Sequence, residues 1–188
     1  MMLWFSGCEP LQTTPFILFL DRDGVINEEN PNFIRRQEDV KIYDDTVPAL
    51  LKAQSLGFRL VIISNQSGLA RGYIDLQTFW DIHQRIVETL ARGGVRISAA
   101  CYCPHHPDDG CSCRKPSPEM LLFTAELFGA SMEKSIFIGD RLTDMEAALR
   151  AGCRGILIKR DLKEISPVSN FPVCRNLKEA VDCIEKLL

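Results

Sequence analysis

The feature that most constrains this chain is an apolar run from Phe16 to Leu20, which ends in two carboxylates, Asp21 and Asp23, and then Gly24. Five successive apolar residues are typical of a parallel strand buried on both faces, and ligands bind beyond the carboxyl ends of such strands. Side chains two positions apart share a face about 6.7 Å apart along the strand, so both aspartates can reach one phosphate. Gly24 permits the positive φ of a turn. Taken alone, the same residues would also suit an exposed turn.

The rest of the chain alternates strand and helix patterns, which predicts an α/β fold with a doubly wound, mainly parallel, Rossmann-like sheet. We expect further strands at 59–64, 95–101, 134–138 and 155–158, and helices at 46–55, 75–91, 117–128, 143–150 and 177–188. No large cap insertion is visible. The length of 188 residues suits a single domain over residues 15–188, with residues 1–14 as a loose extension outside the fold.

Composition narrows the classes of function. The formal net charge is −3 and the sequence pI is about 5.7, so the basic footprint of nucleic-acid binding is missing. No apolar stretch approaches the roughly 20 residues that span a bilayer, and the first residues lack the basic region of an export signal. We therefore expect a cytoplasmic monomer with reduced thiols, a small phosphorylated substrate, and neither nucleic acid nor a membrane as partner.

Polar residues follow four predicted strands and should face one crevice. They are Asp21 with Asp23, Ser64 with Asn65, Lys115, and Asp140 with Asp144. Carboxylates about 4 Å apart repel by roughly 4 kcal/mol per pair at an effective dielectric near 20, so a cation is expected among them. Mg²⁺ binds carboxylates, waters and phosphate oxygens and fits this requirement. Asp144 alone would also suit a helix N-terminal charge.

Four of the eight cysteines lie between residues 101 and 113. Soft ligands at this spacing predict a tetrahedral Cys₃His zinc site, with four protein ligands and hence a structural metal. The predicted ligands are Cys103, His105, Cys111 and Cys113. His106 competes with His105, and a redox pair or ordinary thiols without a special role are the alternative interpretations. Zinc would order this polar loop and place Arg114 and Lys115 over the phosphate.

The motifs Asp21-Arg-Asp-Gly24, Ser64-Asn65, Lys115 and Gly139-Asp-Arg-Leu-Thr-Asp144 resemble those of the haloacid dehalogenase superfamily of phosphotransferases. The resemblance implies the haloacid dehalogenase fold, with Asp21 as the nucleophile that becomes an aspartyl phosphate. Asp23 would protonate the leaving oxygen and later activate water. Ser64 and Lys115 would hold the phosphoryl oxygens. The implied Mg²⁺ ligands are Asp21, the main-chain carbonyl of Asp23, and Asp140, with Asp144 in support.

The segment Cys-Pro-His-His-Pro, followed by Cys-x-Cys-Arg-Lys-Pro, is similar to the D-glycero-D-manno-heptose-1,7-bisphosphate 7-phosphatases and to the related histidinol phosphatases. Residues 65–72 and 21–27 favour the heptose group. The implied activity is Mg²⁺-dependent removal of the 7-phosphate of the heptose bisphosphate. Hydrolysis of histidinol phosphate is the alternative. The acidic pI argues against a nucleic-acid 3′-phosphatase, and a non-catalytic zinc scaffold would not require the ordered acidic motifs.

The same resemblance implies a set of substrate-binding residues. Arg114 and Arg141 suit a second phosphate, because a guanidinium can bind phosphate oxygens bidentately. Arg141 would alternatively be a solvated residue at a helix start. The family has a glycine-aromatic pair where this chain has Pro31-Asn32. The full implied set is Glu29, Asn30, Pro31, Asn32, Ser64, Asn65, Gln66, Ser67, Arg114, Lys115 and Arg141.

Overall fold

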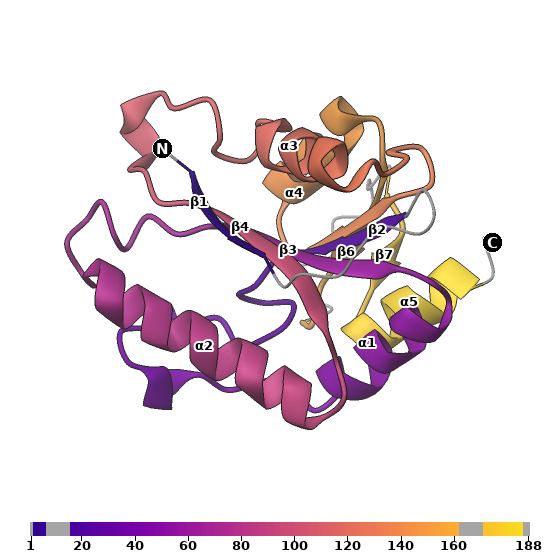
Figure 1. Cartoon of the computed structure of the whole chain (residues 1–188), viewed down its shortest axis with the longest axis horizontal. Coiled ribbons are helices and arrows are strands. Elements are labelled where there is room, and N and C mark those ends of the chain that lie inside the picture. The colour runs from indigo at the N-terminus through magenta and orange to yellow at the C-terminus, as the bar shows by residue number, and fades with distance from the viewer. Residues whose placement is uncertain (1, 7–15, 162–170, 186–188) are drawn as a thin grey trace.

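The computed structural model describes residues 2–6, 16–161 and 171–185, and these residues build a seven-stranded sheet (Figure 1). The sheet order is β1-β4-β3-β2-β5-β6-β7, and every neighbouring pair is parallel except β1 with β4. The strands are β1 (Leu3–Ser6), β2 (Ile17–Leu20), β3 (Arg59–Asn65), β4 (Ile97–Cys103), β5 (Ile136–Gly139), β6 (Arg154–Ile158) and β7 (Val173–Cys174). The predicted doubly wound, mainly parallel sheet is confirmed.

Helices cover both faces of the sheet. Figure 1 shows α3 and α4 on one side and α1, α2 and α5 on the other. The helices are α1 (Thr46–Ser55), α2 (Leu76–Arg92), α3 (Glu119–Phe128), α4 (Leu142–Ala151) and α5 (Leu177–Glu185), with the short 3₁₀ helices η1 (Gln37–Asp39) and η2 (Pro107–Asp109). Among the described residues, no helix has the length and apolarity needed to cross a bilayer.

The core consists of two layers because successive strand residues point to opposite faces. In β2, Leu18 and Leu20 pack with side chains of α1, α2 and α5, while Ile17 and Phe19 pack with those of α3 and α4. Both layers are buried, which explains why the strands read as continuous apolar runs in the sequence.

Strand β2 lies at the point where the order of the strands along the sheet reverses: β3 and β4 follow on one side of it, and β5 and β6 on the other. It pairs with β3 on one side and with β5 on the other, and the main-chain N–H of Asp21 extends the second pairing by donating to Ile138 at 3.0 Å. Ligands of open α/β sheets bind at such a switch point, outside the carboxyl ends of the strands. The fold therefore places Asp21 at the expected binding edge.

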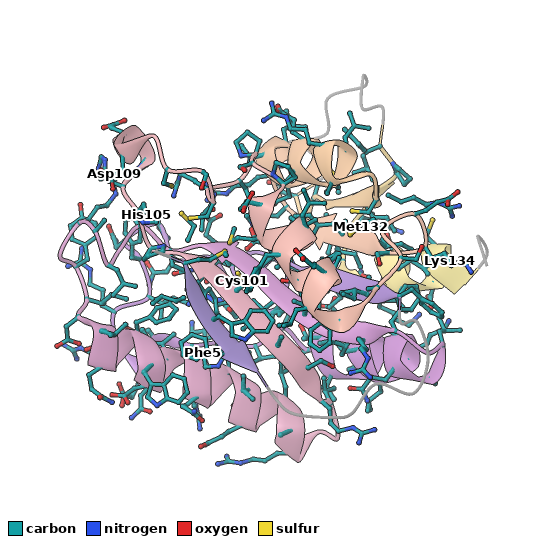
Figure 2. The ribbon with its side chains drawn as sticks, turned by 45° about the horizontal axis from the view of Figure 1, so that its top comes forward. Phe5, Cys101, His105, Asp109, Met132 and Lys134 are labelled. Carbon is teal, nitrogen blue, oxygen red and sulfur yellow. The ribbon has the colours of Figure 1, made fainter. Side chains whose placement is uncertain are left out.

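The N-terminal residues differ from the prediction. Residues 1–14 were expected outside the fold, but Leu3–Ser6 form β1, which pairs antiparallel with β4. The physical reason is that alternate side chains of β1 pack on opposite layers: the Phe5 ring stacks on His83 with centroids 4.6 Å apart, and the Trp4 ring meets Phe123 edge-on at 5.3 Å. Figure 2 shows Phe5 on this edge strand beside α2. Residues 1 and 7–15 lie outside the described residues, and the domain boundary at residue 15 stays a prediction.

Other strands also differ from the prediction. The predicted strand at 95–101 runs from Ile97 to Cys103, so Cys103, and not Cys101, is its last residue. Strand β7 was not predicted, because two residues carry no detectable period. The predicted C-terminal helix is confirmed over Leu177–Glu185, and residues 186–188 lie outside the described residues.

Candidate active site and metal centres

The side chain of Asp21 lies directly beyond β2 and is nearly buried. One carboxylate oxygen accepts the main-chain N–H of Arg22 at 2.7 Å, and the other lies 2.9 Å from the Nζ atom of Lys115. Burial raises the pKa of Asp21, the Lys115 ammonium opposes this rise, and the charge of Asp144 adds to it; the hydroxyl of Ser64 also hydrogen-bonds the carboxylate. Asp21 is thus a desolvated carboxylate with one close cation, an arrangement that suits a nucleophile.

Lys115 is held by strand β3 and by two carboxylates. Its Nζ atom lies 2.7 Å from Asp144 Oδ1 and donates to the carbonyl of Ile63 at 3.0 Å. Burial alone would lower the pKa of Lys115, but Asp144 and Asp21 raise it, so the side chain is an ammonium. Asn65 anchors the main chain of Lys115 through two hydrogen bonds of 3.1 Å, one accepted and one donated.

Three carboxylates meet at the ends of β2 and β5. Single oxygens of Asp21, Asp140 and Asp144 all lie within 4.8 Å of one another. Burial, followed by the charges of Asp21 and Asp144, raises the pKa of Asp140 to about 8, and its Oδ1 atom is buried without a hydrogen-bond partner. A hard divalent cation would satisfy this oxygen and offset the repulsion, so the residues present fit Mg²⁺.

Two glycines allow the carboxylates to approach the main chain this closely. A β-carbon on Gly24, which has a φ of +82°, would lie 2.4 Å from Asp140 Oδ2. A β-carbon on Gly139 would lie 2.3 Å from that of Asp144. Asp144 itself also accepts the main-chain N–H of Arg141 at 3.0 Å, which closes the first turn of α4.

Asp23 points into a set of hydrogen-bond donors. Its carboxylate forms an ion pair of 2.8 Å with Arg22 and accepts from the side-chain amides of Asn27 and Gln66, each at 2.8 Å. Burial raises the pKa of Asp23, but Arg22 and the hydrogen bonds lower it by more, which gives a net depression. Gln66 Nε2 also lies 3.1 Å from Ser64 Oγ, so this amide connects Asp23 with the end of β3.

The four predicted zinc ligands come together beyond the end of β4. Nδ1 of His105 lies 3.5 Å from the sulfur of Cys103 and 3.3 Å from that of Cys113, and the sulfur of Cys111 lies 3.6 Å and 3.9 Å from these two sulfurs. Zinc–sulfur bonds of about 2.3 Å in a tetrahedron require sulfur atoms roughly 3.8 Å apart. The geometry therefore fits zinc.

The competing histidine, His106, has another role. Its ring Nδ1 atom accepts the main-chain N–H of Asp108 at 3.3 Å. The main-chain N–H of His106 donates to the carboxylate of Asp109 at 2.8 Å, so His106 caps η2. Figure 2 shows His105 and Asp109 in the loop that leaves β4. His105 is accordingly the histidine of the cluster, as predicted.

A cavity of about 960 Å³ opens above the carboxylates. Every predicted substrate-binding residue lines it except Asn32, which is exposed and whose main-chain N–H is bound by the side chain of Asn30. The zinc loop supplies part of the wall through Pro107, Gly110 and Cys111.

Several residues of this cavity are not among those predicted from the sequence to bind substrate. The apolar ones carry no chemical signature, whereas Arg71 belongs to the loop 65–72 that was singled out as a motif and could have been found there. These residues are Arg22, Phe33, Ile34, Gly68, Arg71, Ile74, Pro107, Gly110, Pro116, Leu142, Thr143 and Lys159, and Cys111, predicted as a zinc ligand, lines the cavity as well.

Two arginines on the wall differ in their contacts. Nη1 of Arg114 is buried and has no hydrogen-bond partner, whereas Nη2 of Arg141 contacts Glu29 Oε1 across the cavity. An unsatisfied buried guanidinium nitrogen costs free energy unless a ligand accepts from it. Arg114 is therefore suited to an anionic group of a bound molecule.

Comparison with known proteins agrees with this site. Residues 112–180 match the family model described as HAD-hydrolase-like. The D-glycero-beta-D-manno-heptose-1,7-bisphosphate 7-phosphatase of Pseudomonas aeruginosa is 38% identical over 143 residues, which cover 76% of this chain and 80% of that protein. The protein of the same name from Helicobacter pylori J99 is 35% identical, with coverage of 92% and 99%.

A solved structure extends the likeness to the fold. The D,D-heptose 1,7-bisphosphate phosphatase of Bordetella bronchiseptica, solved with magnesium and phosphate, superimposes with a TM-score of 0.84 at 31% identity, and the match covers 92% of this chain and 99% of that one. The acidic motifs, the Cys₃His cluster and the extent of the matches to these relatives all point to the same family. The chain therefore belongs to the D-glycero-D-manno-heptose-1,7-bisphosphate 7-phosphatase family of haloacid dehalogenase-like hydrolases.

Proposed function

We propose that this protein removes the 7-phosphate of D-glycero-D-manno-heptose 1,7-bisphosphate, with magnesium as cofactor and an aspartyl phosphate as intermediate. The observation that carries the proposal is the cluster of Asp21, Asp140 and Asp144 around one small volume, with Lys115 touching two of the three. The names of the relatives supply the substrate. A small phosphorylated sugar also suits a cavity with both polar and apolar walls.

The first chemical step belongs to Asp21. Its carboxylate attacks phosphorus, the bond from phosphorus to the sugar oxygen breaks, and that oxygen takes a proton from Asp23. Water then attacks the phosphorus of the aspartyl phosphate, gives a proton to Asp23, and releases phosphate with the carboxylate of Asp21 restored. Dividing the reaction in this way is useful because uncatalysed hydrolysis of phosphate monoesters is exceptionally slow.

Other residues of the chain hold the phosphoryl group. Lys115 and the hydroxyl of Ser64 would donate to its oxygens, since both already lie against Asp21. Asp21, the main-chain carbonyl of Asp23 and Asp140 would hold Mg²⁺, with Asp144 in support. When bound, Mg²⁺ would neutralise charge on the phosphoryl oxygens and on these carboxylates.

Asp23 needs to change partners to act as an acid. Its carboxylate is now fully engaged by Arg22, Asn27 and Gln66, which favour the ionised form. A leaving oxygen that approaches Asp23 would replace part of this set and favour the protonated form. After proton transfer, the ionised carboxylate of Asp23 would again accept hydrogen bonds from Arg22 and Gln66.

The charge of the cavity favours a bisphosphate over histidinol phosphate. Arg71, Arg114, Arg141 and Lys159 line the wall together with Lys115. Two acids outside the carboxylate cluster also line it, and each is paired with an arginine: Asp23 with Arg22, and Glu29 with Arg141. Histidinol phosphate has one phosphate and a cationic amine, and this amine would meet like charge. A second phosphate would instead bind Arg114, whose Nη1 has no partner.

A comparison of kcat/KM for the heptose bisphosphate and histidinol phosphate tests the proposal. We expect a clear preference for the bisphosphate and loss of activity on both in Asp21→Asn, with Asp39→Asn, an exposed acid away from the cavity, as the matched control. A preference for histidinol phosphate, or near-normal turnover by Asp21→Asn, would overturn it. The expectations of a cytoplasmic monomer without nucleic acid or a membrane as partner stay predictions.

A further inference from the structure

Arg160, two residues beyond β6, contacts the turn that follows the nucleophile. Its Nε donates to the carbonyl of Gly24 at 3.3 Å and its Nη2 donates to that of Val25 at 3.2 Å. The sequence separations are 136 and 135 residues. A single guanidinium therefore fixes two successive carbonyls of the turn that leaves β2.

The position of Arg160 is itself fixed by two residues next to α1. Asp45 accepts from Nη1 at 3.0 Å, and the guanidinium carbon lies 3.4 Å from the centre of the Tyr43 ring. The second oxygen of Asp45 accepts the main-chain N–H of Leu177 at 2.7 Å, at the start of α5. The side chains of Arg160 and Asp45 are largely buried, at 25% and 19% exposure, so water competes little for these contacts.

The turn held by Arg160 belongs to the candidate magnesium site. Gly24 packs so closely on Asp140 that a β-carbon there would lie 2.4 Å from Oδ2 of that residue. The main-chain carbonyl of Asp23, the preceding residue, is one of the proposed Mg²⁺ ligands. A shift of the turn would therefore move this carbonyl and the surroundings of Asp140 together.

We propose that Arg160 is a positioning residue for magnesium: it fixes the turn at Gly24 and Val25 and so holds the Asp23 carbonyl and Asp140 in place for the ion. The proposal rests on the magnesium site of the proposed function. Arg160 lines no part of the cavity, so its effect passes through the turn and not through contact with the substrate. Lysine would not replace it, because a single ammonium cannot reach both carbonyls and Asp45 in the geometry of a planar fork.

The test is calorimetric titration of Mg²⁺ into the whole protein without substrate. Arg160→Met should weaken Mg²⁺ binding about tenfold, the lower limit for the loss of residues that orient metal ligands. Arg160→Lys should weaken Mg²⁺ binding by a smaller factor. Arg175→Met is the matched control, because Arg175 is exposed, pairs with Glu179 and belongs to the same C-terminal part of the chain.

A second readout separates positioning from simple loss of fold. With p-nitrophenyl phosphate, the Mg²⁺ concentration for half-maximal rate should rise in the Arg160 variants, while kcat at saturating Mg²⁺ stays within a few fold of the unchanged protein. A loss of folded protein would instead lower kcat and leave the half-maximal concentration unchanged. If Arg160→Met fails to fold, the Mg²⁺ affinity and half-maximal Mg²⁺ concentration of Arg160→Lys test the proposal instead.

Two outcomes would overturn the proposal, and they differ in meaning. Unchanged Mg²⁺ affinity in the folded Arg160 variants, or an equal loss in Arg175→Met, would overturn the role of Arg160 alone. Absence of Mg²⁺ binding by the unchanged protein would overturn the proposed function as well.

Discussion

The ammonium of Lys115 lies between two carboxylates, 2.7 Å from Asp144 Oδ1 and 2.9 Å from Asp21 Oδ2. Asp144 is fully buried and Lys115 almost so. One cation thus pairs with both the nucleophile and an acid at the start of α4. Because these groups are desolvated, removing Lys115 leaves both carboxylates without their cation, which is costly.

Replacing Lys115 should therefore affect both stability and catalysis. Lys115→Met should lower the free energy of unfolding by about 3–5 kcal/mol, since Asp144 is left as a buried charge. Turnover should fall by at least about 100-fold, because one donor to the developing charge is lost. Urea denaturation and steady-state kinetics measure the two effects. The double variant Lys115→Met/Asp144→Asn should recover part of the stability but not the activity. Recovery of activity would contradict the phosphoryl-binding role of Lys115.

The zinc cluster should distinguish the two adjacent histidines. His105→Ala should lose zinc and melt at a lower temperature, because His105 Nδ1 faces the sulfurs of Cys103 and Cys113. His106→Ala should keep the metal, because His106 only caps η2. Metal analysis and thermal melting, with and without a chelator, give the comparison. Equal zinc contents in the two variants would show that the ligand set is wrong.

Loss of zinc should also lower kcat/KM, although the metal is not at the reacting centre. Cys111 of the cluster and Pro107 and Gly110 beside it line the cavity, and Arg114 and Lys115 directly follow Cys113. The binding energy of a structural zinc, on the order of 10 kcal/mol, orders the loop that carries them. Full activity of chelator-treated, zinc-free protein would contradict this coupling.

Strand β1 should stabilise the fold measurably. Phe5→Ala removes ring contacts with Phe79, Trp80, His83 and Tyr102, and the side chain is only partly buried. We expect a loss of about 2 kcal/mol, below the 3–5 kcal/mol typical of fully buried phenylalanines. Urea unfolding checks the value. An unchanged midpoint would mean that β1 is not docked in solution.

The buried His83 predicts a pH dependence of stability. Burial, with the charge of Arg22 in second place, lowers the pKa of His83 to about 4 from its usual 6.5, and its Nδ1 atom lies 2.9 Å from the hydroxyl of Tyr102. Between these two pH values the unfolded chain binds a proton that the folded protein does not, so stability falls as the pH falls. The loss should reach roughly 3 kcal/mol near pH 4.

His83→Gln should flatten this dependence, because glutamine does not titrate. Unfolding free energies at intervals between pH 7 and 4 give the difference between the two proteins, and the NMR signals of the His83 ring should show no titration above pH 5. A ring that titrates near pH 6.5 would contradict the assignment.

The sequence by itself determined the local features of this protein. Each predicted strand and helix is present, because burial on both faces of the sheet requires continuous apolar runs that short-range patterns reveal. The acidic motifs and the zinc ligands were also visible, since their chemistry depends on residue type and close spacing. Cys103, Cys111 and Cys113, for example, lie within 11 positions of one another.

The tertiary structure decided which distant residues meet. Three contacts join segments that are 43 to 136 positions apart in the sequence: the pairing of β1 with β4, the hydrogen bond from Gln66 to Asp23, and those from Arg160 to the carbonyls of Gly24 and Val25. No periodicity records such contacts, because they depend on how the strands are ordered and on which side chains point to the same face. Local patterns specify the elements, and only their packing brings Lys115 between Asp21 and Asp144.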